Sequence, residues 1–436
     1  MAAQVNPPRG MRDFLPADKA RREHALGVIR GVYRAHGFDE IETPVVEDWS
    51  RLHAGLGGDN EKLSFSILKR GIRPEQLAAA AEAGNAEQLA DLGLRFDLTV
   101  PLTRFYASHR AELPPVFRAI QIAPVWRAER PQKGRYRQFV QADIDIIGEP
   151  GLLAEIELIT ATSQALSELG LDGCAIRVND RRILFGLLGH CGFAEEQHDR
   201  ALITIDKLDK IGAAGVVDEL RGIDAAAAER IGGVLARVEP ALAGDGIPLT
   251  REAIRAVLPA AAPGSGVEAG AESLAELGAA LAGALPAGVS LRFDPTLVRG
   301  MGYYTGTIFE IAHPGSGSSV GGGGRYDGMV GRFLGHEVPA VGFSIGFERV
   351  VDLIELPGDT GPEAIALIHD ADASPADLAA VKRELVARGH RVRLERRQKN
   401  VRALLDRVSA EGFTRFASVP AGLRSADDLE LRALEA

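Results

Sequence analysis

The sequence predicts an α+β protein with a strand-rich core, a helical insertion that splits this core, and a small α/β domain at the C-terminus. Three observations predict this fold. The chain has 436 residues, more than one hydrophobic core usually organises. Strand-like alternation occurs on both sides of a helix-rich segment built on Ala, Leu, Glu and Arg. Strand-like and helical patterns then alternate again at the C-terminal end. We expect the core at 1–178 and 287–357, the insertion at 179–286 and the last domain at 362–436.

Composition excludes several classes of protein. Apolar residues make up 46% and charged residues 25% of the chain, which excludes wholesale disorder, collagen-like repeats and coiled coil. The net charge is −10, so a nucleic-acid partner would have to meet local basic patches. Two cysteines are too few for a disulfide framework or a structural zinc site, which fits a reducing cytosol.

No segment reads as a leader or a membrane anchor. The N-terminus has no apolar stretch typical of a signal peptide. The longest uncharged stretch, Leu277 to Leu291, is shorter than the roughly 20 residues that a spanning helix needs, and glycines and a proline interrupt it. We therefore expect a cytoplasmic protein without a membrane partner.

The N-terminal part begins with a helix. Between Ala17 and His36, Leu26, Ile29 and Tyr33 follow helical spacing, and Gly37 ends the pattern. The next elements are an extended segment around Pro44, a helix over Glu75–Asp91 and a strand over Leu94–Thr99. In that strand, Arg95, Asp97 and Thr99 would share a polar face.

A long hairpin follows over Ala119–Gly148, with its turn at Glu129–Arg135 marked by a proline and a glycine. Leu152–Glu168 then reads as an amphipathic helix and Cys174–Val178 as a short strand. The hairpin makes antiparallel pairing the expected arrangement in this part of the core.

Beyond the hairpin, the patterns are weaker. In the insertion, Leu258–Gly270 is rich in Ala, Gly and Pro and reads as a flexible joint. Arg292–Ile311 is strand-like in pattern, Gly315–Gly324 is rich in glycine and serine, and we expect a helix at Val341–Leu356 and a linker at Pro357–Pro362. The last domain alternates strands and helices, expected at Ala364–Ile368, Pro375–Arg388, Arg391–Leu394, Val401–Glu411 and Phe413–Val419.

The hairpin carries the densest chemistry. Four arginines and a lysine lie between Arg127 and Phe139, interleaved with the aromatic residues Tyr136 and Phe139, as a polyphosphate or nucleic-acid site would need. A solvated hairpin tip is the alternative. In the following strand, Phe139, Gln141, Asp143 and Asp145 share one face, which needs water or a polar ligand. Together with Asp97 and Thr99, this face could form the floor of a site for a small cationic or amino-bearing substrate.

Three glycine-rich segments also attract attention. Arg299 is followed by Gly300 in a stretch where the backbone could approach a ligand closely, although a turn at a strand edge is the alternative. The run Gly321–Gly328 would be a flexible loop in most proteins. On a helix, Arg349 would lie over the gap left by Gly346 and Gly342, so a flat or anionic ligand could bind there; a surface arginine on a packed helix is the alternative.

Several common sites are absent from the sequence. There is no Walker-type phosphate loop and no Gly-x-Gly-x-x-Gly between a strand and a helix. There is also no His/Cys cluster at metal-ligand spacing and no nucleophile-elbow serine. The sequence therefore predicts no protein-bound metal and no covalent serine chemistry.

Taken together, these segments resemble the class II aminoacyl-tRNA synthetases and, within that class, the histidyl-tRNA synthetases. The resemblance runs from Pro8-Arg9-Gly10 to about Leu356, and more weakly over the last domain. Three segments look like the three motifs of the class: Gly37–Glu47, Val125–Asp145 and Pro339–Arg349. Two further segments separate histidyl enzymes from other members: Leu297–Thr305 and Gly322–Gly328. The resemblance implies an antiparallel-sheet catalytic core and a homodimer formed through the first motif.

The resemblance also implies residue roles. Arg127 and Arg299 would be catalytic, with Arg127 on the α-phosphate of ATP and Arg299 between that phosphate and the substrate carboxylate. The predicted histidine-binding residues are Asp97, Thr99, Arg127, Gln141, Asp145, Arg299, Tyr303, Tyr304 and Tyr326. The predicted ATP-binding residues are Arg127, Glu129, Arg135, Phe139 and Arg349. The predicted tRNA-binding residues are Gln132, Lys133, Arg396, Arg397 and Lys399.

The implied activity is that of a histidine–tRNA ligase. Its partners would be L-histidine, ATP with Mg²⁺ on its β- and γ-phosphates, and tRNA(His). The chain departs from the family at Met301-Gly302, where Leu-Asp is common, and at Asp97 and Asp145, where bacterial members often carry Glu. The last domain resembles the family's anticodon-binding domain but ends at Ala436, and we expect its final helix to be missing.

Two other functions stay open. One is a non-catalytic relative that serves as the regulatory subunit of ATP phosphoribosyltransferase; such relatives usually lack the last domain and the adenylation arginines. The other is a paralogue that adenylates an amino acid for an acceptor other than tRNA. Pyrophosphate exchange followed by tRNA charging would separate all three functions.

Overall fold

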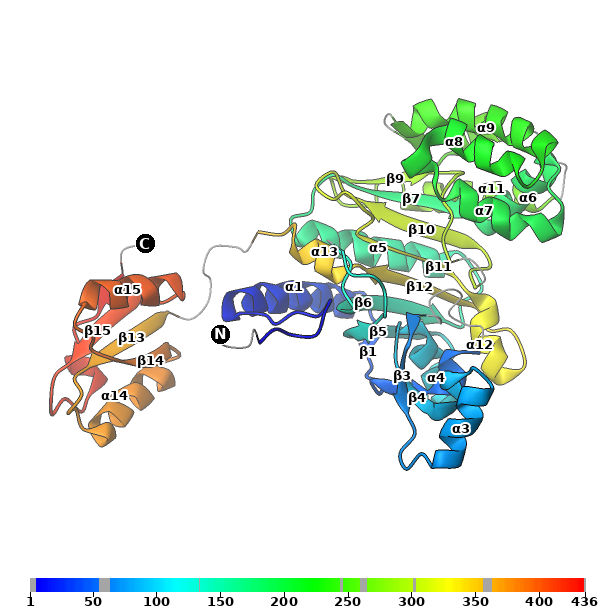
Figure 1. The fold of residues 1–436 in the computed structure, drawn as a ribbon. Helices are drawn as coiled ribbons and strands as arrows, with labels where there is room; N and C mark the ends of the chain where they lie inside the picture. The colour runs from blue at the N-terminus through cyan, green and yellow to red at the C-terminus, as the bar shows by residue number, and fades with distance from the viewer. Residues whose placement is uncertain are drawn as a thin grey trace. The chain divides into compact units, whose positions relative to one another are not determined.

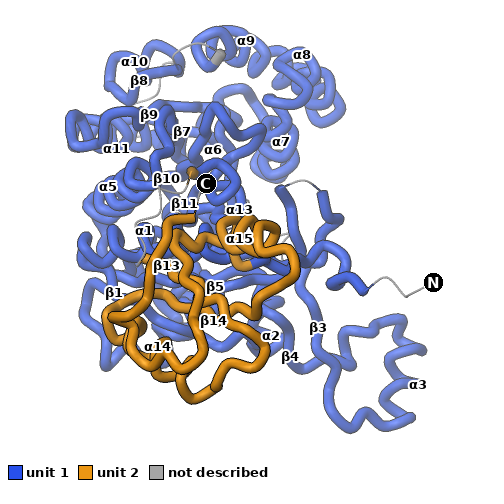
Figure 2. The backbone as a smooth tube through the Cα atoms, turned by 90° about the vertical axis from the view of Figure 1, so that its left-hand side faces the viewer, with its two compact units in different colours: residues 1–15, 19–354 blue, residues 16–18, 355–436 orange. Residues whose placement is uncertain are grey.

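The computed structural model describes residues 5–54, 63–132, 134–243, 246–258, 265–300, 303–355 and 363–434. The chain divides into two compact units, one of residues 1–15 and 19–354 and the other of residues 16–18 and 355–436 (Figures 1 and 2). The predicted joint at Leu258–Gly270 lies partly, and the predicted linker Pro357–Pro362 wholly, outside the described residues.

A nine-stranded sheet organises the first unit, in the order β1-β5-β6-β12-β11-β10-β7-β9-β8. From β5 to β7 every neighbouring pair is antiparallel, and the pairs β1–β5 and β7–β9 are parallel. The strands are β1 (Asp39–Glu40), β5 (Phe117–Trp126), β6 (Gln138–Ile147), β7 (Cys174–Asp180), β8 (Ile247–Pro248), β9 (Val289–Phe293), β10 (Thr307–Ala312), β11 (Gly321–Arg325) and β12 (Ala340–Ile345). The expected α+β fold with an antiparallel core and the expected hairpin, β5–β6, are confirmed.

The two faces of β6 separate apolar from polar side chains. Ala142, Ile144 and Ile146 are fully buried in the main hydrophobic core, against α1 (Pro16–Ala35) and α5 (Leu153–Glu168). Both helices were expected from their apolar spacing, and Ala25, Ile29 and Leu158 supply part of the contact. The opposite face of β6 is therefore free to carry the polar residues of a site.

The glycine run is a strand of the sheet and not a loop. Gly321–Gly324 belongs to β11, which pairs with β10 on one side and β12 on the other. The expectation of a flexible loop was wrong because backbone hydrogen bonds from two neighbours outweigh the weak strand propensity of glycine. Glycine inside a strand often marks a close approach of another group, and this is the case here.

The helix expected at Val341–Leu356 was also wrong over its first part. Val341–Ile345 lies in β12, and a short helix, α13 (Phe347–Val351), follows. A short apolar run is compatible with a buried strand as well as with a helix, so periodicity could not separate them. Gly342 and Arg349 therefore do not share a helix face, although both line the same cavity.

A second sheet, of three strands, lies in the first unit in the order β2-β4-β3: β2 (Val46–Asp48), β3 (Phe65–Leu68) and β4 (Ala90–Leu94). The expected strand Leu94–Thr99 was wrong, because β4 ends at Leu94 and α4 (Thr99–His109) begins at Thr99. Arg95 is buried, where it donates to the Pro124 and Thr43 carbonyls, so the segment turns inward. The helix expected at Glu75–Asp91 is shorter, α3 (Pro74–Glu82), because a short 3-10 helix follows at Ala86–Leu89 and β4 begins at Ala90.

Helices dominate the segment between β7 and β9, beside which they gather in Figure 1. They are α6 (Arg181–Cys191), α7 (His198–Ile205), α8 (Leu208–Arg221), α9 (Ala225–Ala243), α10 (Arg251–Val257) and α11 (Gly266–Leu281). Their apolar residues, among them Leu184, Val216 and Leu274, belong to the same hydrophobic cluster as the sheet. The segment therefore packs as part of the first unit. Short helices α2 (Trp49–Leu52) and α12 (Asp327–Leu334) complete this unit.

The second unit is a four-stranded sheet in the order β14-β13-β15-β16 with two helices. Its elements are β13 (Ala364–His369), α14 (Pro375–Ala387), β14 (Arg391–Arg396), α15 (Val401–Ala410), β15 (Arg415–Val419) and β16 (Arg432–Ala433). The pairs β13–β14 and β13–β15 are parallel. The elements expected from the sequence are present within a few residues of their expected bounds. In the described part of the chain, no helix has the length and hydropathy needed to cross a membrane.

Candidate active site

A cavity of about 720 Å³ lies over the polar face of the large sheet in the first unit. Its size suits a small-molecule site. Every residue that the sequence analysis assigned to histidine or ATP lines it: Asp97, Thr99, Arg127, Glu129, Arg135, Phe139, Gln141, Asp145, Arg299, Tyr303, Tyr304, Tyr326 and Arg349. Segments far apart in the sequence thus meet at one place. Of the residues assigned to tRNA, Arg396, Arg397 and Lys399 belong to the second unit, Gln132 lies in the turn of the hairpin, and Lys133 lies outside the described residues.

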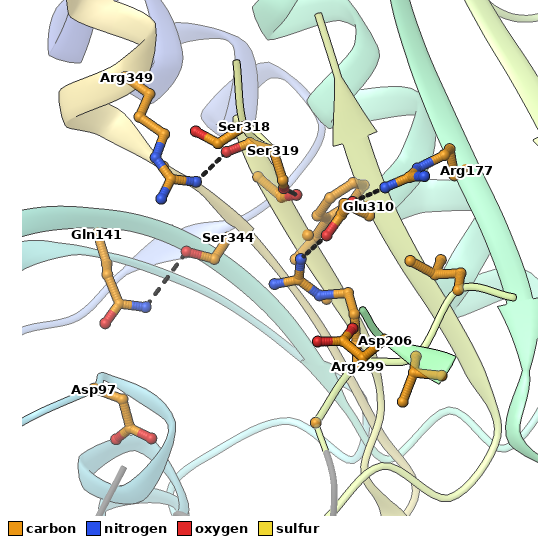
Figure 3. A pocket seen from close by; sticks show the side chains of 18 of the residues that line it. Asp97, Gln141, Arg177, Asp206, Arg299, Glu310, Ser318, Ser319, Ser344 and Arg349 are labelled. Carbon is orange, nitrogen blue, oxygen red and sulfur yellow. Dashed lines mark hydrogen bonds and ion pairs between the residues drawn. The ribbon is translucent and has the colours of Figure 1, made fainter. Parts of the chain in front are cut away.

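Carboxylic acids form one part of the cavity. Asp143 and Asp145 project from β6 and are each 4% exposed. The Tyr326 hydroxyl donates to Oδ1 of Asp145 at 2.6 Å, and Gln141 Nε2 donates to Oδ2 of Asp143 at 3.2 Å. Gln141 also lies 3.4 Å from the Ser344 hydroxyl of β12, and Asp97 lies on the same side of the cavity (Figure 3). This part of the cavity offers acceptors to an amino or imidazole group.

Burial changes the charge of these acids. Burial, with a smaller contribution from the nearby Asp97, raises the pKa of Asp145 to about 7. Burial, and next the neighbouring Asp145, raises the pKa of Asp143 well above its ordinary value. At neutral pH the two acids therefore carry less than two negative charges while the cavity holds no cation. A bound cationic group would favour the ionised form and be held by it.

This burial predicts a pH-dependent stability. Between pH 4 and 7 the folded protein keeps a proton on Asp145 that the unfolded chain releases, so stability falls as the pH rises through this range. At about 1.4 kcal/mol per pKa unit, the cost reaches about 4 kcal/mol above pH 7. We expect Asp145→Asn to remove this cost: urea unfolding at pH 5 and pH 8 should show a smaller loss of stability in the variant. The exposed Asp91→Asn is the control, and an equal pH response in all three proteins would contradict the prediction.

Arginines form the other part of the cavity. Arg127 follows β5, donates from Nε to the Phe96 carbonyl at 2.9 Å, and lies 5.1 Å above the centroid of the Phe139 ring. Arg349, in α13, donates to the Ser319 carbonyl (Figure 3). Arg135 lies 3.4 Å from the carboxylate of Glu129. Burial lowers the pKa of Arg349, and the positive charges of Arg135 and Arg299 lower it further. An anion with several negative charges would relieve this repulsion.

Tyrosines lie between these two parts. The Tyr303 and Tyr304 rings have their centroids 4.2 Å apart, and Tyr326 is buried. Burial raises the pKa of each of the three hydroxyls, which therefore stay protonated and able to donate hydrogen bonds at neutral pH. The cavity thus places acceptors for a cation and donors for anions within one enclosure.

The comparisons with known proteins agree with this geometry. Residues 10–350 match the family model described as Histidyl-tRNA synthetase. The chain belongs to the histidyl-tRNA synthetase family. It is therefore an aminoacyl-tRNA synthetase, an enzyme of the ligase class, as the sequence motifs indicated.

Curated histidine–tRNA ligases match this synthetase over nearly its whole length. A histidine–tRNA ligase of Leifsonia xyli subsp. xyli is 68% identical over 421 residues, which cover 97% of this chain and 96% of that relative. A probable histidine–tRNA ligase of Tropheryma whipplei, strain Twist, is 44% identical and covers 95% of each chain.

Solved structures share the fold. The histidyl-tRNA synthetase of Nostoc sp. PCC 7120 superposes with a TM-score of 0.76 at 24% identity, over 99% of this chain and 95% of the other. An ATP phosphoribosyltransferase regulatory subunit/histidyl-tRNA synthetase from Bacillus halodurans C has a TM-score of 0.73 at 22% identity, over 97% and 99%. At these identities the likeness concerns the fold alone.

Sequence reasoning missed part of the cavity of this synthetase. Arg177, Asp206, Glu310, Ser319 and Ser344 line it but were not singled out. Glu310 had a signal, because it is the one charged residue among the apolar residues of Thr307–Ala312. Ser344 was missed because we expected a helix at Val341–Leu356. Asp206 had no signal, because it follows helix α7, whose position against the sheet no local pattern gives.

Proposed function

We propose that this synthetase activates L-histidine with ATP in the cavity, forming histidyl-adenylate and pyrophosphate, and then transfers the histidyl group to the 3′ end of tRNA(His). One observation carries the proposal beyond family membership: buried carboxylic acids and a group of arginines open into the same cavity. A substrate with cationic and anionic ends, together with a polyphosphate, suits such a cavity. The identity of 68% to a histidine–tRNA ligase over nearly the full length supports the same activity.

Histidine would bind at the acidic part. Asp97, Thr99, Gln141 and Asp145 would hold its amino group and imidazole, and Tyr303, Tyr304 and Tyr326 would close the pocket around it. The buried environment of Asp145 supports this placement, because a cation there favours its ionised form. In a buried site, a ligand that leaves a polar group without a partner loses binding energy. An acidic site filled with water would discriminate less well between histidine and other amino acids, because water would satisfy the groups that the wrong ligand leaves unpaired.

ATP would bind at the basic part. Arg127 would contact the α-phosphate, and Glu129 would accept from the adenine amino group. The adenine would lie between Phe139 and Arg349, while Arg135 and Arg349 reach the γ-phosphate. Arg299 would bridge the α-phosphate and the carboxylate of histidine.

The reaction is an in-line displacement. A carboxylate oxygen of histidine attacks the α-phosphorus, the bond from that phosphorus to the bridging oxygen breaks, and pyrophosphate leaves. Both reactants are anionic where they meet, so charge neutralisation and alignment matter more than a strong base. Arg127, Arg299 and Arg349 come from three separate segments and are already placed by hydrogen bonds to Phe96, Glu310 and Ser319, which lowers the reorganisation needed in the transition state.

Mg²⁺ would accompany ATP. In the described residues, no group of three His, Cys, Asp or Glu side chains is arranged to hold a metal ion. An ion bound with ATP would take most of its ligands from phosphate oxygens and water, with one or two from the protein. When bound, Mg²⁺ would neutralise charge on the β- and γ-phosphates. The chain's own residues would still align the reacting atoms.

The larger organisation is part of the proposal. Residues 1–178 and 287–357 would form the catalytic core, 179–286 a helical insertion and 362–436 an anticodon-binding domain. Two copies would pair through Gly37–Glu47, in the cytoplasm. In the last unit, Arg397 is paired with Asp370 at 2.7 Å, so part of its predicted basic surface is already engaged. Together with Gln132 and Lys133, the residues Arg396, Arg397 and Lys399 would contact tRNA phosphates.

Pyrophosphate exchange tests the activity. We expect ATP–pyrophosphate exchange that depends on L-histidine and stays at background with L-glutamine, followed by charging of tRNA(His). Absence of histidine-dependent exchange would overturn the proposal and favour a regulatory protein. Exchange without tRNA charging would indicate an adenylating enzyme with another acceptor.

A further inference from the structure

Three residues on three adjacent strands of the large sheet lie side by side in the lining of the cavity. In the register of the antiparallel strands, Glu310 of β10 lies opposite Arg177 of β7 on one side and Gly322 of β11 on the other. Residues directly opposite in antiparallel strands share a face. Arg177, Glu310 and Gly322 therefore lie side by side, and all three line the cavity.

Glu310 is held from two sides. Its Oε2 accepts from Arg299 Nη1 at 2.6 Å, and its Oε1 accepts from Arg177 Nη2 (Figure 3). The Glu310 side chain is 14% exposed. Burial alone would raise the pKa of Glu310, but the charges of Arg299 and Arg177 outweigh it and lower that pKa, so the group stays a carboxylate. Because each oxygen already accepts from an arginine, Glu310 is suited to hold another side chain and not a substrate.

Gly322 leaves space for the guanidinium of Arg299 to lie against the strand. A Cβ at position 322 would lie 2.6 Å from Cζ of Arg299, far inside van der Waals contact. The strand surface therefore leaves room for the guanidinium only because residue 322 has no side chain. Glu310 fixes one edge of Arg299, and Gly322 fixes how closely its plane approaches the sheet.

Arg177 is fixed in turn. Its Nη1 donates at 3.2 Å to Oδ2 of Asp294, whose side chain is buried, and lies 3.5 Å from Asp209 of the insertion helix α8. The two arginines and the two carboxylates Glu310 and Asp294 form a network with alternating charges. Such a network holds its members in one arrangement, because each buried charge has an opposite neighbour.

We propose that Glu310 is a positioning residue that orients Arg299 for adenylate formation, with Arg177 holding Glu310 and Gly322 admitting the guanidinium. This inference rests on the proposed role of Arg299. A guanidinium has five N–H donors in a fixed fork. Glu310 binds the Nη1 group and so sets the direction of the remaining donors.

Kinetics of histidine-dependent exchange test this role. Glu310→Gln keeps the shape but removes the charge, and we expect kcat to fall about 10- to 100-fold, since small misplacement of a reacting group has effects of this size. KM for ATP and for histidine should change less than about threefold, because Arg299 would act chiefly on charge that develops in the transition state. Glu157→Gln is the matched control: Glu157 is bound by Arg118 through both oxygens, outside the cavity, and its variant should keep normal exchange.

A double variant separates positioning from direct action. Because Glu310 acts through Arg299, adding Glu310→Gln to Arg299→Ala should cause no further loss. A further loss of tenfold or more would overturn the proposal. If Glu310→Gln fails to fold, Glu310→Asp decides, since it keeps the charge but withdraws the carboxylate; it should also lower kcat, and normal exchange would contradict the proposal.

The positioning role of Glu310 and the proposed function can be contradicted separately. If Glu310→Gln keeps normal kcat while Arg299→Ala loses exchange, the positioning role is wrong and the proposed function stands. If Arg299→Ala itself keeps exchange, the role of Arg299 is wrong, and the positioning role falls with it.

Discussion

Arg299→Ala is expected to lower histidine-dependent pyrophosphate exchange by at least about 10³-fold, with the fold intact. Removing one preorganised donor from a site that stabilises anionic charge commonly costs 10²–10³-fold, and an arginine that acts on a transferring phosphoryl group costs more. Arg299 combines both features, because it would neutralise the two anionic groups that react. The measurement is exchange at saturating histidine and ATP, beside circular dichroism and thermal unfolding.

A matched arginine provides the control. Arg292 is also partly buried in the first unit and donates to the Ser290 hydroxyl, but it does not line the cavity among the described residues. Arg292→Ala should therefore keep exchange within about threefold of the original protein. Near-normal exchange in Arg299→Ala would show that the assigned role is wrong. Equal losses in both variants would point to a general effect on the fold.

The sequence predicted which residues line the cavity better than it predicted the secondary structure of the segments that carry them. Alternation on β6 placed Gln141 and Asp145 on one face, opposite Ile144, because a strand buried on one side imposes a period of two. This pattern is local and can be read from one strand. The motif resemblance then supplied residues from other segments, and every one that it assigned to histidine or ATP lines the same cavity.

The failures came where the surroundings decide the local structure. Nothing within Gly321–Gly324 favours a strand, yet hydrogen bonds from β10 and β12 make it one. At Leu94–Thr99, apolar and polar residues alternate strictly, but the polar Arg95 is buried as well, because it finds carbonyl acceptors inside the protein. The alternation therefore did not mark a strand with one exposed face. The contact between Glu310 and Arg177 depends on the register of β7 and β10, which are separated in the sequence by the helices α6 to α11. No local pattern contains that information.

Gly323→Ala should strongly destabilise the first unit, although it adds a single methyl group. Gly323 lies in β11 opposite Phe309 of β10 and Phe343 of β12. A Cβ there would lie 1.9 Å from the Gly342 carbonyl oxygen and 2.8 Å from the Phe343 Cα atom, both of which belong to the backbone of β12. A side chain could rotate away, but these atoms can move only if β11 and β12 separate. We expect a loss of about 3 kcal/mol or more in the free energy of unfolding.

The same change should reach the active site. Gly342 pairs with Asp145 across β12 and β6, so displacing β12 would shift the buried carboxylate that is proposed to bind histidine. Thermal unfolding and exchange should therefore fall together in Gly323→Ala. Gly328→Ala is the control: Gly328 lies in helix α12, and a Cβ there would meet nothing within 4 Å. Because alanine also favours a helix over glycine, that variant should be at least as stable as the original protein. A stable Gly323→Ala protein would mean that β11 and β12 can separate at little cost, and that the glycine run serves the close approach of Arg299 at Gly322 and not the packing of the strands.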